Sequence, residues 1–345
     1  MIVSIVSFAC VIAICVIVHE MGHFLTARAA GVHVHEFSLG FGPVLASRMR
    51  GATMWAVRAV PLGGFVRLGG LEEEGDEVVP AGGSFMEKPA WKRFFILFNG
   101  PLANMILALL LTAFFLVAHG TLDVESTRIG EIMPGYPAEK AGIQVGDEIR
   151  SVNEQSVVSW KEMSDAIRNH ALKGPVAFRI DRSGVLRTVT VNIPNDARSG
   201  VPVFGIRPSF KRYPPHTALS SAFGFTISMS VEMIRNIGLW ISGKSDMDVA
   251  GPVGIASMAG DAARRGSWTF ISFLALISLN LGLLNLFPFP ALDGGRLVFI
   301  LGEMLTGRRV PEKTEGFIHY VGFIVLIGLI IFVTWNDISK LIFSN

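Results

Sequence analysis

The sequence predicts an α-helical polytopic membrane protein of about four transmembrane helices, with a membrane-reentrant β-hairpin region and one inserted α+β domain. Half of its 345 residues are hydrophobic, only 17% are charged, and the mean hydropathy is +0.49. Such values are typical of a chain that crosses a bilayer. The formal net charge is +2 and no cluster of basic and aromatic residues occurs, so nucleic-acid binding gains no support.

Four apolar runs have the length of about 20 residues that a membrane-spanning helix needs. They are 1–23, 94–118, 268–289 and 317–335. No Lys or Arg precedes the first run, so we expect a retained helix and not a cleaved signal segment. A further stretch, 218–241, carries Glu232 and Arg235 near its centre. We expect this stretch to form an amphipathic helix on the membrane surface or beneath the soluble domain.

Basic residues are concentrated in the connection between the first two runs and in the connection between the last two. They are Arg28, Arg48, Arg50, Arg58, Arg67, Lys88, Lys92 and Arg93 in the first connection, and Arg296, Arg308, Arg309 and Lys313 in the second. By the positive-inside rule, both connections are cytoplasmic. Four spans then place both chain ends and residues 119–267 on the opposite, extracytoplasmic side.

The segment 33–70 lacks helical character. Gly and Pro recur in it, as in Gly40-Phe41-Gly42-Pro43, and residues 53–60 show the partial alternation of a strand. The segment is too apolar for a solvated loop, which predicts a β-hairpin that dips into the membrane. Backbone of this kind is tolerated at membrane depth only where protein or a water-filled cavity shields it.

Residues 124–207 have the composition of a soluble domain. Short alternating strands are followed by a predicted helix over 159–169 and by a strand pair, 176–181 and 186–193, joined across Arg182-Ser183-Gly184. A segment of this length, about 80 residues, is long enough for one small hydrophobic core.

The first apolar run ends in His19-Glu20-Met21-Gly22-His23. On a helix, this spacing sets two imidazoles on one face with a carboxylate beside them, which suits Zn²⁺ and a Glu that handles protons on a metal-bound water. The alternative is a helix end whose polar side chains meet lipid headgroups. Ionisable groups in spans are costly and usually functional, which favours the metal site. Such a site needs a third protein ligand.

Asp293 is the candidate for that ligand. It is expected near the cytoplasmic end of the third spanning helix, and its depth matches that of His19 because both lie about 20 residues into their spans, at 1.5 Å per residue. Two His and one carboxylate leave a fourth position open for water. The alternative is an ordinary turn residue among Pro and Gly. Asn285 is placed to donate to a substrate backbone or oxyanion, and Pro288 with Pro290 would unwind the helix.

At this point the sequence resembles the site-2 protease family of intramembrane zinc metalloproteases, specifically the bacterial regulator-of-sigma-E protease type. The segments that carry the resemblance are the His-Glu-x-x-His run, Gly40-Phe41-Gly42-Pro43, Pro61-Leu62-Gly63-Gly64, Asn99-Gly100-Pro101 with Asn104, a PDZ-like domain, Gly251-Pro252-Val253-Gly254-Ile255, and the Asn-x-x-Pro-x-Pro-x-Leu-Asp-Gly block that ends at Gly294. They are distributed over nearly the whole chain.

The resemblance implies a metalloendopeptidase with a zinc cofactor. Its site residues would be His19, His23 and Asp293 as ligands, Glu20 as the catalytic acid and base, and Asn285, Pro288, Gly63, Gly64, Ile129 and Gly130 in substrate binding. Its substrates would be single-span membrane proteins, cut within their transmembrane segments in regulated intramembrane proteolysis. Anti-sigma factors, remnant signal peptides and small regulatory membrane proteins fit equally well.

The family also implies how substrates reach the site. An extended substrate would add as a strand to the edge of the hairpin 53–68. The PDZ-like domain would bind a peptide or a new C-terminus around Ile129 and Gly130. The best-known Gram-negative members carry two tandem PDZ domains, whereas this sequence has one. The expected location is the bacterial inner membrane, with the PDZ-like domain on the periplasmic side and the remainder in contact with the lipid bilayer.

The expected domains are a first half of the protease core at 1–123, the PDZ-like domain at 124–207, a helical linker region at 208–267 and a second half of the core at 268–345. Two functions from other classes compete. A catalytically inactive membrane PDZ adaptor would not need Glu20 between the histidines. A metal transporter would need more ligands along a path, and the remaining histidines form no such line in the predicted spans.

Overall fold

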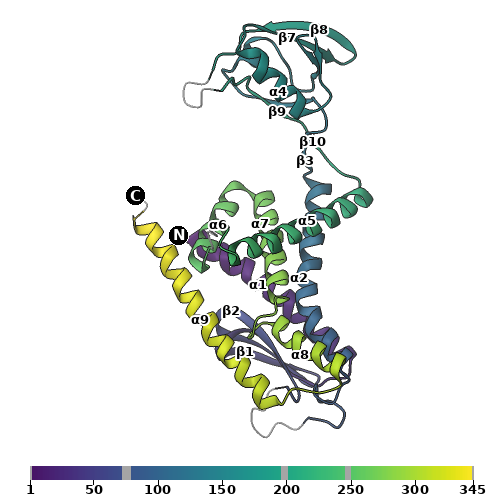
Figure 1. Ribbon diagram of the computed structural model, residues 1–345, viewed down its shortest axis with the longest axis vertical. Coiled ribbons are helices and arrows are strands. Elements are labelled where there is room, and N and C mark those ends of the chain that lie inside the picture. The colour runs from purple at the N-terminus through teal and green to yellow at the C-terminus, as the bar shows by residue number, and fades with distance from the viewer. Residues whose placement is uncertain (1, 72–78, 196–200, 245–249, 344–345) are drawn as a thin grey trace. The chain divides into compact units, whose positions relative to one another are not determined.

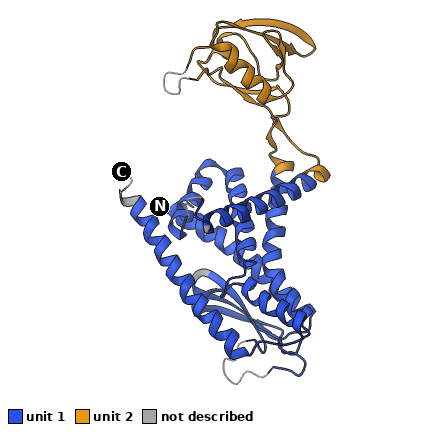
Figure 2. Cartoon of the chain, in the orientation of Figure 1, with its two compact units in different colours: residues 1–115, 219–345 blue, residues 116–218 orange. Residues whose placement is uncertain are grey.

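The computed structural model describes residues 2–71, 79–195, 201–244 and 250–343 (Figure 1). The chain divides into two compact units (Figure 2). The first comprises Met1–Phe115 with Leu219–Asn345, and the second, an insertion within the first, comprises Leu116–Ala218. The predicted fold class is confirmed: long apolar helices and a β-hairpin region form one unit, and an α+β domain is inserted into it.

Four helices among the described residues are long and apolar enough to cross a membrane. They are α1 (Ile2–Ala29), α2 (Ala90–Ala118), α7 (Ser267–Asn285) and α9 (Glu312–Phe343). The predicted helix over 218–241 is α5 (Pro215–Ile241), which is not among these four. Its exposed surface carries large apolar side chains, including Phe223, Phe225 and Val231. Two shorter helices, α6 (Pro252–Arg265) and α8 (Asp293–Thr306), complete this unit.

Helices α1 and α2 approach so closely that side chains are excluded at the crossing. A Cβ atom on Gly22 would lie 2.1 Å from the backbone oxygen of Asn99, and one on Gly100 would lie 2.2 Å from Nε2 of His23. Glycine at both positions therefore lets α2 pack directly against the face of α1 that carries the histidines.

The predicted β-hairpin is present as two long antiparallel strands, β1 (Val34–Arg50) and β2 (Thr53–Leu68). Each strand bends back on itself. Residues 34–39 pair with 64–68 on one side and with 54–57 on the other, while 44–50 pair with 53–58. The segment 64–68 therefore forms one edge of this sheet. Gly40 (φ +91°) and Gly63 (φ +115°) lie at the bends, in a backbone region that favours glycine.

A buried carboxylate holds the sheet together. Glu36 is 1% exposed and accepts hydrogen bonds from Arg58 at 3.0 and 2.7 Å and from Arg67 at 3.4 Å. The three residues come from segments far apart along the two strands, so the ion pairs fix which residues lie opposite one another. A buried charge needs such partners because isolated burial is very costly.

The inserted unit has its own core, formed by the buried side chains of a four-stranded sheet and two helices. Its sheet has the order β6-β5-β7-β8, and the predicted pairing across Ser183-Gly184 is present, with Val176 opposite Val191. The elements are β3 (Thr121–Leu122), β4 (Ile129–Ile132), α3 (Pro137–Lys140), β5 (Glu148–Val152), β6 (Gln155–Ser156), α4 (Trp160–Ala171), β7 (Val176–Arg182), β8 (Val185–Val191), β9 (Ile206–Pro208) and β10 (Phe210–Lys211).

An ion pair links the start of β5 to the end of β7 in this domain. Asp147 is 2% exposed and accepts hydrogen bonds from Arg182 at 2.7 Å and from the Gln144 N–H at 2.8 Å. Burial alone would raise the pKa of Asp147, but these hydrogen bonds outweigh burial and hold the pKa below its ordinary value.

This pair predicts an acid-sensitive domain. Because the Asp147 pKa is lower in the folded than in the unfolded chain, the stabilisation is present above the unfolded value of about 4 and is lost as pH falls through the folded value. We expect hydrogen-exchange protection in β5 and β7, taken relative to the intrinsic exchange rate at each pH, to fall below about pH 4, measured by mass spectrometry on the full-length protein in detergent. Asp147→Asn should exchange faster at neutral pH and show a flatter pH profile. The exposed Asp165→Asn serves as the control, and an identical profile for both variants would contradict the assignment.

Candidate metal centre

Two histidines of α1 and the first residue of α8 bring three ligand atoms together. Nε2 of His19 lies 3.1 Å from Oδ2 of Asp293, Nε2 of His23 lies 3.4 Å from the same oxygen, and the two nitrogens are 3.2 Å apart. A tetrahedral zinc ion with ligands at about 2.0–2.1 Å has ligand–ligand distances of about 3.3 Å. The three atoms therefore have the spacing of one face of a tetrahedron, and the group can hold a metal ion.

The tautomer of His23 supports the same conclusion. Its Nδ1 donates to the backbone oxygen of Ile96 at 2.8 Å, so the neutral ring has a bare lone pair on Nε2. That lone pair faces the Asp293 carboxylate and Nε2 of His19. Electron-rich atoms at this separation repel one another unless a proton or a metal cation lies between them. A histidine oriented from behind by a backbone carbonyl is also the usual arrangement around a bound metal. The donor set fits Zn²⁺.

Glu20 lies beside the three ligand atoms and contacts the sheet formed by β1 and β2. Its carboxylate accepts a hydrogen bond from the backbone N–H of Val66, in the edge segment 64–68. The sheet approaches α1 closely here, because a Cβ atom on Gly64 would lie 2.8 Å from Val16 and 2.7 Å from the backbone oxygen of Ser38. Glycine at position 64 thus allows the strand edge to reach the carboxylate.

Two cavities meet at this group. The smaller cavity, of about 230 Å³, and the larger one, of about 540 Å³, both include His19, Glu20 and Asp293 in their walls. The smaller cavity extends toward Asn104 of α2 and Asn285 of α7. The larger cavity extends along the edge of β2 toward α9.

The segment that carries Asp293 differs from the prediction in one respect. The sequence placed Asp293 near the end of the third spanning helix, but α7 ends at Asn285 and Asp293 begins a separate helix, α8. The turn between them contains Pro288 and Pro290, which lack the N–H that would continue a helix. Gly294 permits the tight return, since a Cβ atom there would lie 2.1 Å from the backbone oxygen of Phe287.

The predicted substrate-binding residues do not all lie at this centre. Asn285, Gly63 and Gly64 line the smaller cavity. Pro288 is exposed in the turn after α7 and lines neither cavity.

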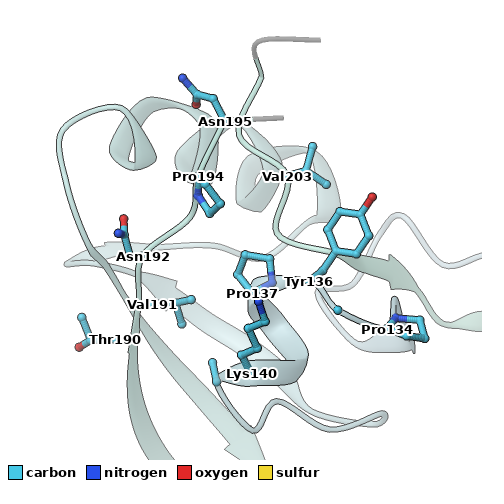
Figure 3. Close-up of a pocket in the computed structure, with 12 residues that line it drawn as sticks. Pro134, Tyr136, Pro137, Lys140, Thr190, Val191, Asn192, Pro194, Asn195 and Val203 are labelled. Atoms are coloured by element: carbon cyan, nitrogen blue, oxygen red, sulfur yellow. The ribbon is translucent and has the colours of Figure 1, made fainter. Parts of the chain in front are cut away.

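Ile129 and Gly130 lie in β4 of the inserted domain. The side chain of Ile129 is 1% exposed, and its backbone is bonded to Asp147 and Gly146. A hollow of about 660 Å³ in that domain lies elsewhere, between the segment around Tyr136 and Pro137 and the segment around Val191 and Asn192 (Figure 3).

Sequence reasoning missed two residues of the smaller cavity. Cys15, interpreted as a packing residue, is buried, lines the cavity and hydrogen bonds with Ser278 of α7. Its position four residues before His19, on the same helix face, was the available signal. Asn104 is 1% exposed, and its Oδ1 has no hydrogen-bond partner among the described residues. A buried amide in a spanning helix is costly, which was the signal for Asn104.

Comparison with known proteins identifies the family. The model of peptidase family M50 matches residues 7–329. The chain belongs to peptidase family M50. It is 34% identical to the putative zinc metalloprotease CA_C1796 of Clostridium acetobutylicum, with 94% of each chain covered, and 29% identical to the zinc metalloprotease RasP of Geobacillus kaustophilus, with 98% of each covered. It is 33% identical to the putative zinc metalloprotease RC0203 of Rickettsia conorii, over 98% of this chain and 99% of that one.

Among solved structures, the PDZ domain of an SdrC-like protein from Listeria innocua is similar to 26% of this chain, over 99% of its own length, with 18% identity and a TM-score of 0.23. The predictions of a metalloprotease and of a zinc cofactor are confirmed by the family, by the names of the relatives and by the His-His-Asp group. The chain is a multi-pass membrane zinc metalloprotease.

The ligand set predicts the effect of substitutions on metal content. His19→Ala and Asp293→Ala each remove one of three protein ligands, so both variants should hold clearly less zinc after purification, measured by elemental analysis. His170→Ala, in α4 of the inserted domain, is the control and should keep the wild-type zinc content. Unchanged stoichiometry in either test variant would reject that residue as a ligand.

Proposed function

We propose that this metalloprotease hydrolyses peptide bonds within the transmembrane segments of single-span membrane proteins. The observation that carries the proposal is the position of the His-His-Asp group. Two of its members lie within α1, a helix long and apolar enough to span a bilayer, and the third lies in the same unit directly after the turn that follows another such helix, α7. A peptide bond must enter the membrane-embedded part of the protein to reach such a group.

The geometry supports a role for each residue of the group. His19, His23 and Asp293 would hold the zinc ion, which would supply the chemistry of a lowered water pKa and a polarised carbonyl group. Glu20 lies next to these ligands and acts as the catalytic base and then the acid: it takes a proton from the attacking water and gives one to the leaving amine. The N–H of Val66 orients the Glu20 carboxylate for both steps.

The edge of β2 provides a binding place for an extended substrate. A helical substrate hides its carbonyl groups in internal hydrogen bonds, so it must unwind locally before hydrolysis. The segment 64–68 pairs with β1 on one side only, and the N–H of Val66 points from its other side toward Glu20. A substrate strand added along this edge recovers backbone hydrogen bonds at the point where its own helix has lost them.

The smaller cavity supplies polar contacts from α2 and α7 beside the metal group. Asn285, the last residue of α7, donates from its side-chain amide to the substrate carbonyl oxygen as negative charge develops on it. Gly63 and Gly64 line this cavity through their backbone, because the positions that a Cβ atom would take are filled by Phe41 and Val16. Pro288, which lines neither cavity, ends α7 and so frees backbone groups near Asn285.

The inserted PDZ-like domain controls which substrates enter. By the distribution of basic residues, it lies on the extracytoplasmic side of the bacterial inner membrane. There it admits substrates that another protease has shortened. It does so either by excluding substrates with a bulky extracytoplasmic part or by binding the new C-terminus of the shortened substrate. Ile129 and Gly130 contribute through their backbone and not through the buried Ile129 side chain. Anti-sigma factors and remnant signal peptides are the substrate classes to be distinguished.

The first test concerns Glu20. Glu20→Gln preserves the shape of the side chain but removes its basicity, so the variant should keep its zinc and lose cleavage of a single-span substrate by at least about 100-fold in detergent. Zinc is measured by elemental analysis and cleavage by mass spectrometry of the products. The exposed Glu125→Gln is the control and should cleave normally. Substantial turnover by zinc-loaded Glu20→Gln would refute the assignment.

A second test addresses the substrate class in cells. Membrane-embedded peptide fragments are compared by mass spectrometry between cells with the native protein and cells with the Glu20→Gln form. Uncut single-span substrates should accumulate only with the variant, and their sequences separate anti-sigma factors from signal-peptide remnants. Identical sets of membrane-embedded fragments in the cells with the native protein and in the cells with the Glu20→Gln form would contradict cleavage within the membrane.

A further inference from the structure

The last spanning helix supports the turn that carries Asp293. Gly322 of α9 packs against Pro290 so closely that a Cβ atom there would lie 2.3 Å from the Pro290 Cβ. One turn earlier, Nδ1 of His319 lies 3.0 Å from the backbone N of Ala291, two residues before Asp293. Ala291 has a φ of +77°, which is unfavourable for a residue with a side chain and needs support from its surroundings.

This contact determines where the proton of His319 lies. A backbone N–H can only donate, so Nδ1 must accept, and the neutral ring carries its proton on Nε2. That Nε2–H is buried and has no hydrogen-bond partner among the described residues. The Glu315 carboxylate, one turn before His319, lies 4.0 Å away and is too distant for a hydrogen bond. A buried donor without an acceptor is costly, which points to an acceptor that arrives with a ligand.

The walls of the larger cavity indicate the kind of ligand that would bring this acceptor. One wall is the edge of β2, with Phe65 and Val66, and another is the face of α9 that carries Gly316 and His319. Carbonyl groups of an extended strand alternate in direction. A peptide paired with the β2 edge therefore directs every second carbonyl group away from it. In apolar surroundings, each carbonyl group directed away from β2 needs a hydrogen-bond donor on the opposite wall of the cavity.

Resting on the proposed function, we propose that His319 is a substrate-binding residue whose Nε2–H donates to a backbone carbonyl oxygen of the peptide that lies between the β2 edge and α9. The same ring supports the Asp293 turn through Nδ1. The two nitrogens thus make separate hydrogen bonds, and a suitable substitution removes either bond without removing the other.

The test uses two substitutions at His319 in the Glu20→Gln protein, which binds substrate without cutting it. In His319→Asn, the amide oxygen reaches the position of Nδ1, so the bond from Ala291 is kept but the donor is lost. In His319→Gln, the amide nitrogen reaches the position of Nε2, so the donor is kept but the acceptor is lost. The probe is a dye-labelled single-span peptide that the wild-type protein cleaves, and binding is followed by fluorescence anisotropy in detergent at saturating zinc.

We expect His319→Asn to keep the zinc affinity and to bind the probe about tenfold more weakly. His319→Gln should bind the probe within about twofold of the parent at saturating zinc but should lose zinc more readily to a chelator. Glu315→Gln is the control and should bind the probe as the parent does, which excludes Glu315 as the acceptor for Nε2–H.

Three results would overturn the inference. Unchanged probe binding by His319→Asn would show that Nε2–H makes no substrate contact. If His319→Asn and His319→Gln weaken probe binding equally and lose zinc equally, His319 only supports the structure of the turn. Weakened binding by Glu315→Gln would show that Nε2–H of His319 donates to the Glu315 carboxylate and not to the substrate. If the wild-type protein cleaves no single-span peptide, the proposed function itself fails. If the wild-type protein cleaves the peptide but His319→Asn does not weaken probe binding, only the inference about His319 is overturned.

Discussion

The structure depends on the convergence of three electron-rich atoms in surroundings that disfavour charge. Nε2 of His19 and Nε2 of His23, both in the apolar helix α1, lie 3.1 to 3.4 Å from each other and from Oδ2 of Asp293 at the start of α8. Without a shared cation this group would be costly to bury. A metal ion bound by these three atoms would remove the repulsion among them, so metal binding would stabilise the fold of this unit.

Close backbone packing provides the precision that this group requires. Gly22 and Gly100 allow α2 to press against the histidine face of α1, and the carbonyl of Ile96 then orients His23. Gly64 brings the sheet edge to Glu20 in the same way. The sheet keeps its register through the buried Glu36 and its arginines. Glycines thus determine how closely the helices and the sheet edge approach one another, and buried polar groups determine how the side chains at the metal group are oriented.

Much of this arrangement could be predicted from the sequence. Long apolar runs indicate spans by length alone, and the spacing of His19, Glu20 and His23 fixes their relative positions on a helix. The end of α7 at Asn285 was harder to place, because two prolines mark the region of a break but not its first residue. The folding of β1 and β2 back on themselves and the contact of His319 with Ala291 depend on residues far apart in sequence. No local periodicity reports such contacts.

The position of the metal group between two cavities has a consequence for the kind of cut that it makes. A pocket closed on one side holds the end of a chain and releases one residue or a few at a time. Here neither side of the group is closed, since one hollow extends toward α2 and α7 and the other along β2 toward α9. A polypeptide can therefore lie across the zinc ligands with chain continuing in both directions, and the two new ends can separate into different hollows without passing one another.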